Sequence, residues 1–462
     1  MMEIEIEESG LVAPSEETPK HTIWLSNMDL MFPTELYTPT INLFPFNGDP
    51  DFFNIQHLKA ALAKTLVPYY PLAGHLAAND EGRVELLCTG EGVLFVVARS
   101  SSTMDPLLHE FKPSQKMKEL LIPHSESRLI MLQVTFFKCG GVCLGIATNH
   151  AVMDGLSALG FINTWGDIAR GEEPNVVLWL DRTLLRARSP PIVPPEYLEQ
   201  QSQEAKVELA KTSFTEPPAS AMLKLSKDQV NSLKNICGAA TGRRVSTFES
   251  LAAYAWQCVC KARKLGPEEE TRLHLTADAR TRLKPPLPAG FFGNATLRTH
   301  MSSEVGSILS EPLPSTIQKI RDTVAHVDDE FVRSVIDILE TMEDKTDFYL
   351  GKNSYGKNDV WVLSWLTLPI YADFGWGKSV FMGRAQVNSY AMFYVLRGPE
   401  EGGVTILLTL EKENMEEFIK VFYEGLEVPA TVEAKTNGSL RQVEAKTNGS
   451  LPNVEATCVK VD

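Results

Sequence analysis

The alternation of apolar and polar positions predicts helices and strands from the start of the chain. In Phe53–Leu66, leucine and isoleucine recur at helical spacing, and the turn Pro68–Pro71 predicts where that helix ends. Two short apolar runs, Val84–Leu87 and Gly92–Val97, predict a pair of strands around a glycine-rich turn. The first part of the chain therefore mixes both kinds of element.

A stronger strand pattern precedes His150. The apolar runs Leu129–Phe137 and Val142–Ala147 are separated by Gly140–Gly141 and predict a strand, a turn and a second strand. His150 follows at once, and the apolar spacing after it becomes helical as far as Ile162. The pattern therefore places His150 where a buried strand passes into a helix.

The second half of the chain repeats the mixture. It contains a predicted helix, three predicted strands and a closing helix at Thr247–Lys264, Leu273–Leu275, Val360–Leu368, Val404–Leu410 and Met415–Tyr423. A chain of this length exceeds one usual domain. We expect two α/β domains, residues 1–188 and residues 214–428.

A change of composition marks the boundary between them. The segment Ser189–Ser213 is first proline-rich and then polar, which predicts a surface crossover at residues 189–213. After the second domain, Val432–Leu440 recurs eleven residues later as Val443–Leu451. An eleven-residue repeat can build helices, but each copy contains the helix-breaking Asn-Gly-Ser. We expect residues 429–462 to be a disordered repeat tail.

Charge and cysteine usage exclude several classes of protein. Lys and Arg number 44 against 59 Asp and Glu, giving a net charge of −15, so no nucleic-acid partner is expected. The N-terminus is acidic, unlike a targeting signal, and no apolar stretch reaches the length of a membrane span. The 7 cysteines include no Cys-x-x-Cys pair, so neither a disulfide framework nor a zinc site is expected. We expect a cytoplasmic, reduced and monomeric protein.

His150 is the first candidate for chemistry, in the element His150-x-x-x-Asp154-Gly155. An isolated histidine beside an apolar strand is usually a packing residue. Here it stands at a strand end, and an Asp and a turn-forming Gly follow. A neutral imidazole can remove a proton near neutral pH, a step worth roughly 10²–10⁴ in rate. No second histidine pair has the spacing of metal ligands.

The second candidate is Asp373-Phe374-Gly375-Trp376-Gly377. Two glycines around a tryptophan, just after an apolar strand, predict a rigid turn around a large ring. Taken alone, this pattern is more often structural than functional. Together with the element at His150, it becomes diagnostic.

The chain resembles the plant BAHD acyltransferases, whose two signatures are His-x-x-x-Asp-Gly and Asp-Phe-Gly-Trp-Gly. The resemblance covers about residues 5 to 428 and includes three weaker phrases, Leu66–Gly74, Gln133–Gly141 and Pro285–Asn294. It implies two chloramphenicol-acetyltransferase-like domains, each a mixed β-sheet flanked by helices, with a channel between them. It also implies that His150 takes the acceptor proton while the acceptor attacks a coenzyme A thioester, without an acyl-enzyme.

The resemblance assigns roles to further residues. Asp154, Arg280 and Asp373 are expected to support the site, with Asp154 paired to Arg280, although Ala279 replaces the usual glycine of the Asp-Gly-Arg phrase. On the channel and coenzyme A side we expect Gly375, Trp376, Gly377, Ser246, Thr247 and Lys261. Arg263 could also reach the phosphates, although Lys261 and Arg263 fit solvated helix charges better. Coenzyme A is a substrate here, and no metal or other cofactor is expected.

The acyl donor and the acceptor follow from finer features. The phrases Leu25–Asp29, Phe161–Trp165 and Asp181–Arg188 resemble the branch that uses hydroxycinnamoyl or similar aromatic thioesters. On the acceptor side we expect Thr38, Trp365 and Thr367. Shikimate and quinate transferases carry an arginine at the place of Thr367, where it holds the acceptor carboxylate. Its absence removes a charge-assisted bond of roughly 1.5–3 kcal/mol and favours a neutral alcohol or an amine, with the amine slightly ahead.

Three other functions stay open as alternatives. A shikimate or quinate O-hydroxycinnamoyltransferase would need another partner for the carboxylate. A peptide-synthetase condensation domain shares the His-x-x-x-Asp-Gly element but lacks Asp-Phe-Gly-Trp-Gly. A non-catalytic relative that binds coenzyme A esters would be marked by loss of His150, which is present.

Overall fold

The computed structural model describes residues 2–109, 111–173, 177–194, 216–238, 244–350, 355–398 and 400–426. They belong to one compact unit, Met1–Glu427. The expected tail at residues 429–462 and most of the expected crossover at residues 189–213 lie outside the described residues.

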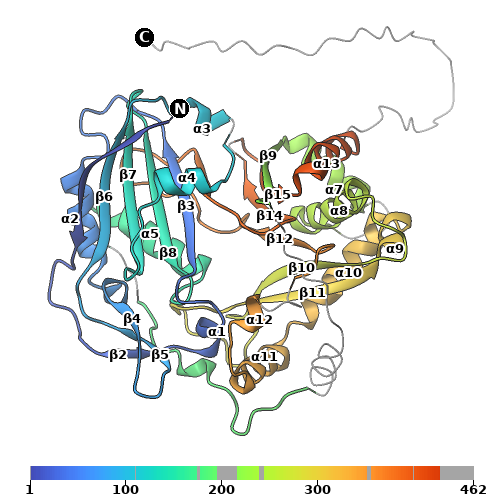
Figure 1. The fold of residues 1–462 in the computed structure, drawn as a ribbon, viewed down its shortest axis with the longest axis horizontal. Helices are drawn as coiled ribbons and strands as arrows, with labels where there is room; N and C mark the ends of the chain where they lie inside the picture. The colour runs from blue at the N-terminus through green and yellow to red at the C-terminus, as the bar shows by residue number, and fades with distance from the viewer. Residues whose placement is uncertain are drawn as a thin grey trace. The chain divides into compact units, whose positions relative to one another are not determined.

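A first six-stranded sheet has the order β1-β6-β7-β8-β3-β13 (Figure 1). Its strands are β1 (Ile4–Val12), β6 (Val93–Ser100), β7 (Ile130–Phe137), β8 (Val142–Asn149), β3 (Tyr37–Phe44) and β13 (Phe381–Arg384). Strands β6 and β7 are parallel, and the other neighbours are antiparallel. Strand β13 comes from the second half of the chain, so both halves contribute to this sheet.

A second six-stranded sheet has the order β11-β10-β12-β14-β15-β9. Its strands are β11 (Thr296–Glu304), β10 (Glu270–Asp278), β12 (Val360–Ser364), β14 (Met392–Arg397), β15 (Val404–Leu410) and β9 (Ala219–Leu225). The pairs β10–β12 and β12–β14 are parallel, and the other three are antiparallel. Both large sheets are therefore mixed, as the sequence predicted.

A third, three-stranded sheet corrects one prediction. It joins β2 (Thr22–Trp24), β5 (Val84–Leu87) and β4 (His75–Ala78). Strands β5 and β6 exist where expected but do not pair with each other, because β6 belongs to the first large sheet. Gly90 and Gly92 between them both have positive φ, and the Gly92 N–H donates to the carbonyl of Ala73. The turn therefore carries the chain from one sheet to the other.

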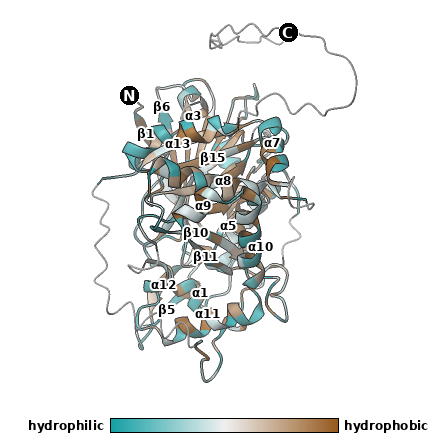
Figure 2. Ribbon diagram, turned by 90° about the vertical axis from the view of Figure 1, so that its right-hand side faces the viewer, coloured by the Kyte–Doolittle hydropathy of each residue, from teal (hydrophilic) through white to brown (hydrophobic). Residues whose placement is uncertain are grey.

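Helices cover the sheets. They are α1 (Asn27–Leu30), α2 (Ile55–Thr65), α3 (Asp105–His109), α4 (Gln115–Leu121), α5 (Gly155–Ala169), α7 (Lys227–Gly238), α8 (Thr247–Ala262), α9 (Val305–Ser310), α10 (Leu313–His326), α11 (Asp329–Thr341), α12 (Asp347–Leu350) and α13 (Lys412–Glu424). Helices α10 and α11 carry hydrophilic and hydrophobic residues side by side, as expected of helices that cover a core (Figure 2). In the described part of the chain, no helix has the length and apolar character needed to cross a membrane.

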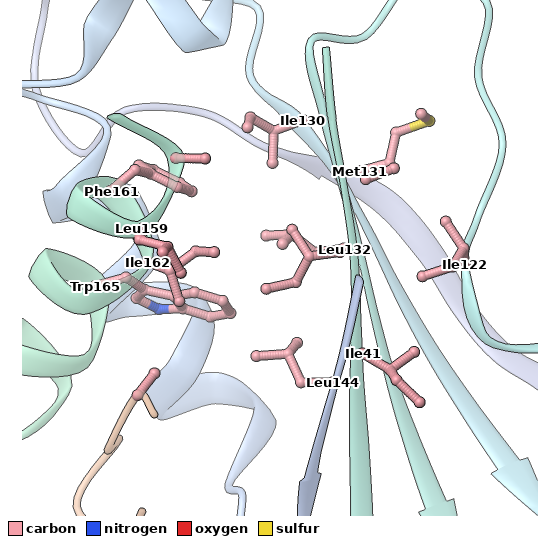
Figure 3. Packing of buried hydrophobic residues seen from close by; sticks show 14 of the residues in the cluster. Ile41, Ile122, Ile130, Met131, Leu132, Leu144, Leu159, Phe161, Ile162 and Trp165 are labelled. Carbon is pink, nitrogen blue, oxygen red and sulfur yellow. The ribbon is translucent and has the colours of Figure 1, made fainter. Parts of the chain in front are cut away.

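The core of the first half lies between its sheet and helix α5. Leu132 and Leu144 point from neighbouring strands toward Leu159 and Trp165 of α5, whereas Met131 lies on the opposite face of the sheet (Figure 3). This alternation follows from the two-residue period of a strand. The second sheet packs in the same way against α8, whose Trp256 is fully buried. Each half thus has a sheet with a buried helix against it.

Candidate active site

A cavity of about 1190 Å³ lies between the two large sheets. Its lining includes Thr38 and His150 from the first half of the chain, and Thr276 and Trp361 from β10 and β12 of the second sheet. A cavity of this size accommodates a small-molecule ligand. The site is therefore built by residues far apart in the sequence.

His150 is held rigidly at the end of β8. Its backbone N–H donates to the carbonyl of Leu36 at 2.8 Å, and its ring stacks on Phe32 with 4.0 Å between the ring centroids. Nδ1 is buried and has no hydrogen-bond partner among the described residues. Nε2 is not among the buried, unpartnered atoms. Nε2 is therefore the ring nitrogen open to the cavity.

The surroundings favour the uncharged form of the His150 ring. Burial lowers the pKa of His150 below its ordinary value, and the cation of Arg384 acts in the same direction. The carbonyl of His150 itself, Asp154 and Asn294 raise the pKa but do not outweigh burial. A neutral imidazole with an open Nε2 is the form that can accept a proton.

The carboxylate of Asp154 is occupied by hydrogen bonds and an ion pair. Its side chain is the N-cap of α5, accepting the N–H of Ser157 at 3.0 Å, and it also accepts the N–H of Ala295 at 3.1 Å. Arg280 forms two bonds to the same carboxylate, at 2.8 and 3.0 Å. Burial alone would raise the pKa of Asp154, but this ion pair and the hydrogen bonds hold it below its ordinary value.

The sequence matches known proteins along most of its length. A family model described as "Transferase family" matches residues 2–424. Putrescine hydroxycinnamoyltransferase 1 from Oryza sativa subsp. japonica is 44% identical over 456 residues, covering 92% of this chain and 100% of that protein. Shikimate O-hydroxycinnamoyltransferase from Nicotiana tabacum is 38% identical, with the same coverage of both chains. The chain belongs to the BAHD family of acyltransferases.

A solved structure has the same fold. The crystal structure of vinorine synthase matches with a TM-score of 0.68 at 22% identity, over 90% of this chain and 96% of that chain. The predicted fold, two mixed-sheet halves with a channel between them, is confirmed. As a member of the BAHD family, the protein is an acyl-CoA-dependent O- or N-acyltransferase.

The three residues expected on the acceptor side of this acyltransferase all line the cavity. Thr38 lies on β3, and Trp365 and Thr367 follow β12. Asp154 and Arg280 also contribute to the lining, next to His150. The structure therefore brings the candidate base and the expected acceptor-side residues into one space.

The Asp373–Gly377 turn lies elsewhere. The carboxylate of Asp373 accepts the N–H groups of Gly375 at 2.9 Å and Gly377 at 3.2 Å, which closes the turn. Trp376 stacks on Phe53 beside α2, with 5.2 Å between the ring centroids. Within the described residues, none of the five lines the His150 cavity, and the place of Gly375, Trp376 and Gly377 beside coenzyme A stays a prediction.

The other residues expected on the coenzyme A side lie at the two ends of α8. Ser246 is the N-cap of this helix and forms a capping box with Glu249, and Thr247 is the first helical residue. Lys261 lies at the exposed other end, about 20 Å away by the rise of a helix. The interpretation of Arg263 as a solvated helix charge is wrong, because its side chain is 5% exposed and its guanidinium forms an ion pair with Glu411 at 2.6 Å.

Sequence reasoning missed three residues of the site. Phe32 stacks on the His150 ring, Asn294 donates to the His150 carbonyl at 2.9 Å, and Arg298 lines the cavity. Asn294 ends the family phrase Pro285–Asn294, which was the only signal available for it. Phe32 and Arg298 carry no local pattern, since only the tertiary structure brings them to the cavity.

Proposed function

We propose that this acyltransferase moves an aromatic, hydroxycinnamoyl-like acyl group from coenzyme A to an amine or a neutral alcohol, with the amine slightly ahead. The observation that carries the proposal is His150, a neutral imidazole whose Nε2 opens into a cavity shared by both halves of the chain. The names of the two relatives above, both hydroxycinnamoyltransferases, support the aromatic donor.

In the proposed reaction both substrates occupy the cavity together. Nε2 of His150 removes the proton from the acceptor nitrogen or oxygen while that atom attacks the thioester carbonyl. The tetrahedral intermediate collapses, the carbon–sulfur bond breaks and the thiolate of coenzyme A leaves. The Phe32 ring stacked on His150 keeps the imidazole fixed between the two substrates.

The proposal includes no acyl-enzyme. A covalent route needs a hydroxyl or thiol activated by hydrogen bonding to the base, and none bonds to the His150 ring in the described part of the chain. Cys143, on the strand that leads to His150, is fully buried, and burial raises the pKa of its thiol. The test is incubation with the acyl donor alone, followed by mass spectrometry of the intact protein. A stoichiometric acyl adduct would overturn this part of the mechanism.

The acceptor preference rests on the cavity wall at position 367. Thr367 lines the cavity with a neutral hydroxyl side chain, which offers a carboxylate no charge-assisted bond. The relative with the higher identity of the two above is named for putrescine, an amine. Initial rates with amines, neutral alcohols and shikimate, each with an aromatic coenzyme A ester, test the preference directly.

One observation favours a second candidate, an acceptor that carries a carboxylate, such as shikimate or quinate. The guanidinium of Arg298 lines the cavity, stacked over Trp361 at 5.1 Å and Tyr349 at 5.6 Å from the ring centroids. Among the described residues no carboxylate lies within 4.0 Å of it, and burial lowers its pKa. Arg298 could thus supply the cation that position 367 lacks.

The variant Arg298→Gln separates the two candidates. The first predicts that amine turnover changes little and that carboxylate acceptors are poor in both proteins. The second predicts a preference for the carboxylate acceptor in the wild type and at least about a tenfold loss of it in the variant. Binding of coenzyme A esters without any turnover would instead identify a non-catalytic relative.

A further inference from the structure

The three successive N–H groups of Gly293, Asn294 and Ala295 are each held by a side chain. Gly293 donates to the hydroxyl of Ser157 at 3.2 Å, Asn294 to Asp29 at 3.0 Å, and Ala295 to Asp154 at 3.1 Å. Gly293 has a φ of +155°, and a Cβ there would lie 2.9 Å from the guanidinium of Arg182. This short segment is therefore fixed in position beside His150.

The side chain of Asn294 bridges Asp29 and His150. Its amide nitrogen donates to the carboxylate of Asp29 at 2.9 Å and to the backbone carbonyl of His150 at 2.9 Å. Both partners can only accept, because one is a carboxylate and the other a carbonyl. The hydrogen-bond network therefore decides which end of the amide is nitrogen, and the amide oxygen must lie on the remaining side.

A second interaction joins the Asn294 side chain to the imidazole. The Asn294 side chain contacts the His150 ring and raises its pKa, as a hydrogen-bond acceptor does. Oδ1 of Asn294 and Nδ1 of His150 are both buried, and neither has a hydrogen-bond partner among the described residues, so pairing the two with each other would satisfy both. An amide oxygen can pair only with a protonated Nδ1, which leaves Nε2 free of hydrogen.

Asp29 is itself buried and anchored. It is 0% exposed, accepts the Ser26 hydroxyl at 2.7 Å and lies 3.5 Å from the guanidinium of Arg182, which is also buried. Arg182 donates in addition to the carbonyls of Val152 and Phe292, two residues beyond His150 and two before Asn294. The ion pair thus joins the turn that carries the base to the turn that carries the amide.

We propose that Asp29 and Asn294 are positioning residues that hold His150 in the tautomer with the proton on Nδ1, so that Nε2 can accept the acceptor's proton. Asp29 orients the amide of Asn294, and this amide in turn sets the tautomer of the imidazole. The catalytic consequence rests on the proposed function, in which Nε2 is the base, whereas the tautomer itself does not depend on any turnover.

The first experiment observes the tautomer directly. The protein is labelled with ¹⁵N-histidine, and the ring signals of His150 among the 9 histidines are identified by their loss in His150→Ala. The wild type is expected to show a protonated Nδ1 and an unprotonated Nε2, and Asn294→Ala is expected to show a mixture of tautomers. A wild-type ring with its proton on Nε2 overturns the inference, whether or not any substrate is turned over.

The second experiment measures rates in two backgrounds. Asn294→Ala and Asp29→Ala are each expected to lower kcat at least about tenfold, with little change in KM for the acyl donor. In His150→Ala, adding Asn294→Ala is expected to cost no further rate, because its effect passes through the imidazole. A further loss of similar size in that background overturns the inference.

The pH profile and a matched control complete the test. The groups acting on His150 are its own carbonyl, Asp154 and Asn294, which raise its pKa, and Arg384, which lowers it. Removing the amide therefore moves the acid limb of kcat to lower pH, and an unmoved limb argues against the contact.

Asn42, a buried asparagine of β3 outside the cavity lining, provides the control. Asn42→Ala is expected to leave the acid limb and the tautomer as in the wild type.

Discussion

Replacing Arg280 by glutamine removes the cation from a buried ion pair. The side chains of Arg280 and Asp154 are 11% and 1% exposed, so solvent screens the pair little. The variant leaves the Asp154 carboxylate with the N–H groups of Ser157 and Ala295 but without its countercharge. Breaking a buried pair in this way costs about 3–5 kcal/mol. Arg280→Gln is therefore expected to lower the free energy of unfolding by about this amount.

The expected change can be converted into a melting temperature. With an unfolding entropy of about 2.1 cal/mol/K per residue, a unit as long as Met1–Glu427 has about 0.9 kcal/mol/K. The predicted loss then lowers Tm by about 3–6 °C, which circular dichroism or differential scanning calorimetry resolves easily. Arg99→Gln is the control, because the Arg99 side chain is 59% exposed and its pair with Glu7 is worth at most about 1 kcal/mol.

Activity measurements distinguish a structural role of Arg280 from a direct role in the reaction. At a temperature where the variant is folded, Arg280→Gln is expected to retain more of kcat than His150→Ala does. The double variant Asp154→Asn with Arg280→Gln is expected to cost less stability than the two single losses added together, because it removes both charges of the pair. An unchanged Tm for Arg280→Gln, or full additivity in the double variant, would refute the reasoning.

Three further predictions concern the acceptor, the base and the tryptophan turn. Thr367→Arg is expected to raise kcat/KM for shikimate relative to an amine by about 10- to 100-fold, as one charge-assisted bond allows; an unchanged ratio in initial rates would contradict this. Because burial lowers the pKa of His150, kcat is expected to stay constant through neutral pH and to reach half its plateau only below pH 6.5; a midpoint above 6.5 in a pH–rate profile counts against it. Trp376→Ala is expected to cost about 1–3 kcal/mol of stability, because a half-buried ring loses its contact with Phe53. If the turn acts through packing alone, KM for the acyl donor stays unchanged, whereas a large rise in KM at constant Tm would place the turn at coenzyme A.

Helices and strands with a clear apolar period were predicted from the local sequence alone. The predicted strand Val404–Leu410 is β15, and the runs on either side of Gly140–Gly141 pair as the antiparallel strands β7 and β8. The predicted helix Phe53–Leu66 is α2, at Ile55–Thr65. These segments have a clear apolar period and short turns, so little depends on distant parts of the chain.

The same patterns did not predict which strands pair when the partners lie far apart in the sequence. Strands β5 and β6 were found but assigned to each other, since their apolar runs do not say which sheet each one joins. Strand β13, of only four residues, joins the first sheet through β3, from which it is separated by most of the sequence. Such partners are set by tertiary packing, which the sequence of one strand does not contain.

In the candidate site too, residues in a local motif were predicted and residues brought there by distant contacts were not. His150 and Asp154 carry a motif and were predicted, whereas Asp29, Asn294 and Arg298 depend on contacts between segments far apart in the chain. Thr367 was noticed only because the family resemblance supplies an arginine for comparison. A motif thus identifies the base, but its supporting hydrogen bonds require the folded structure.

The central claim is that His150 is the general base of acyl transfer. The most direct measurement compares kcat of the wild type and His150→Ala with an aromatic coenzyme A ester and an amine acceptor, together with donor binding. We predict a loss of about 10²-fold or more in kcat with donor affinity preserved. Turnover of His150→Ala within about tenfold of the wild type would contradict the account, because another group would then be removing the proton.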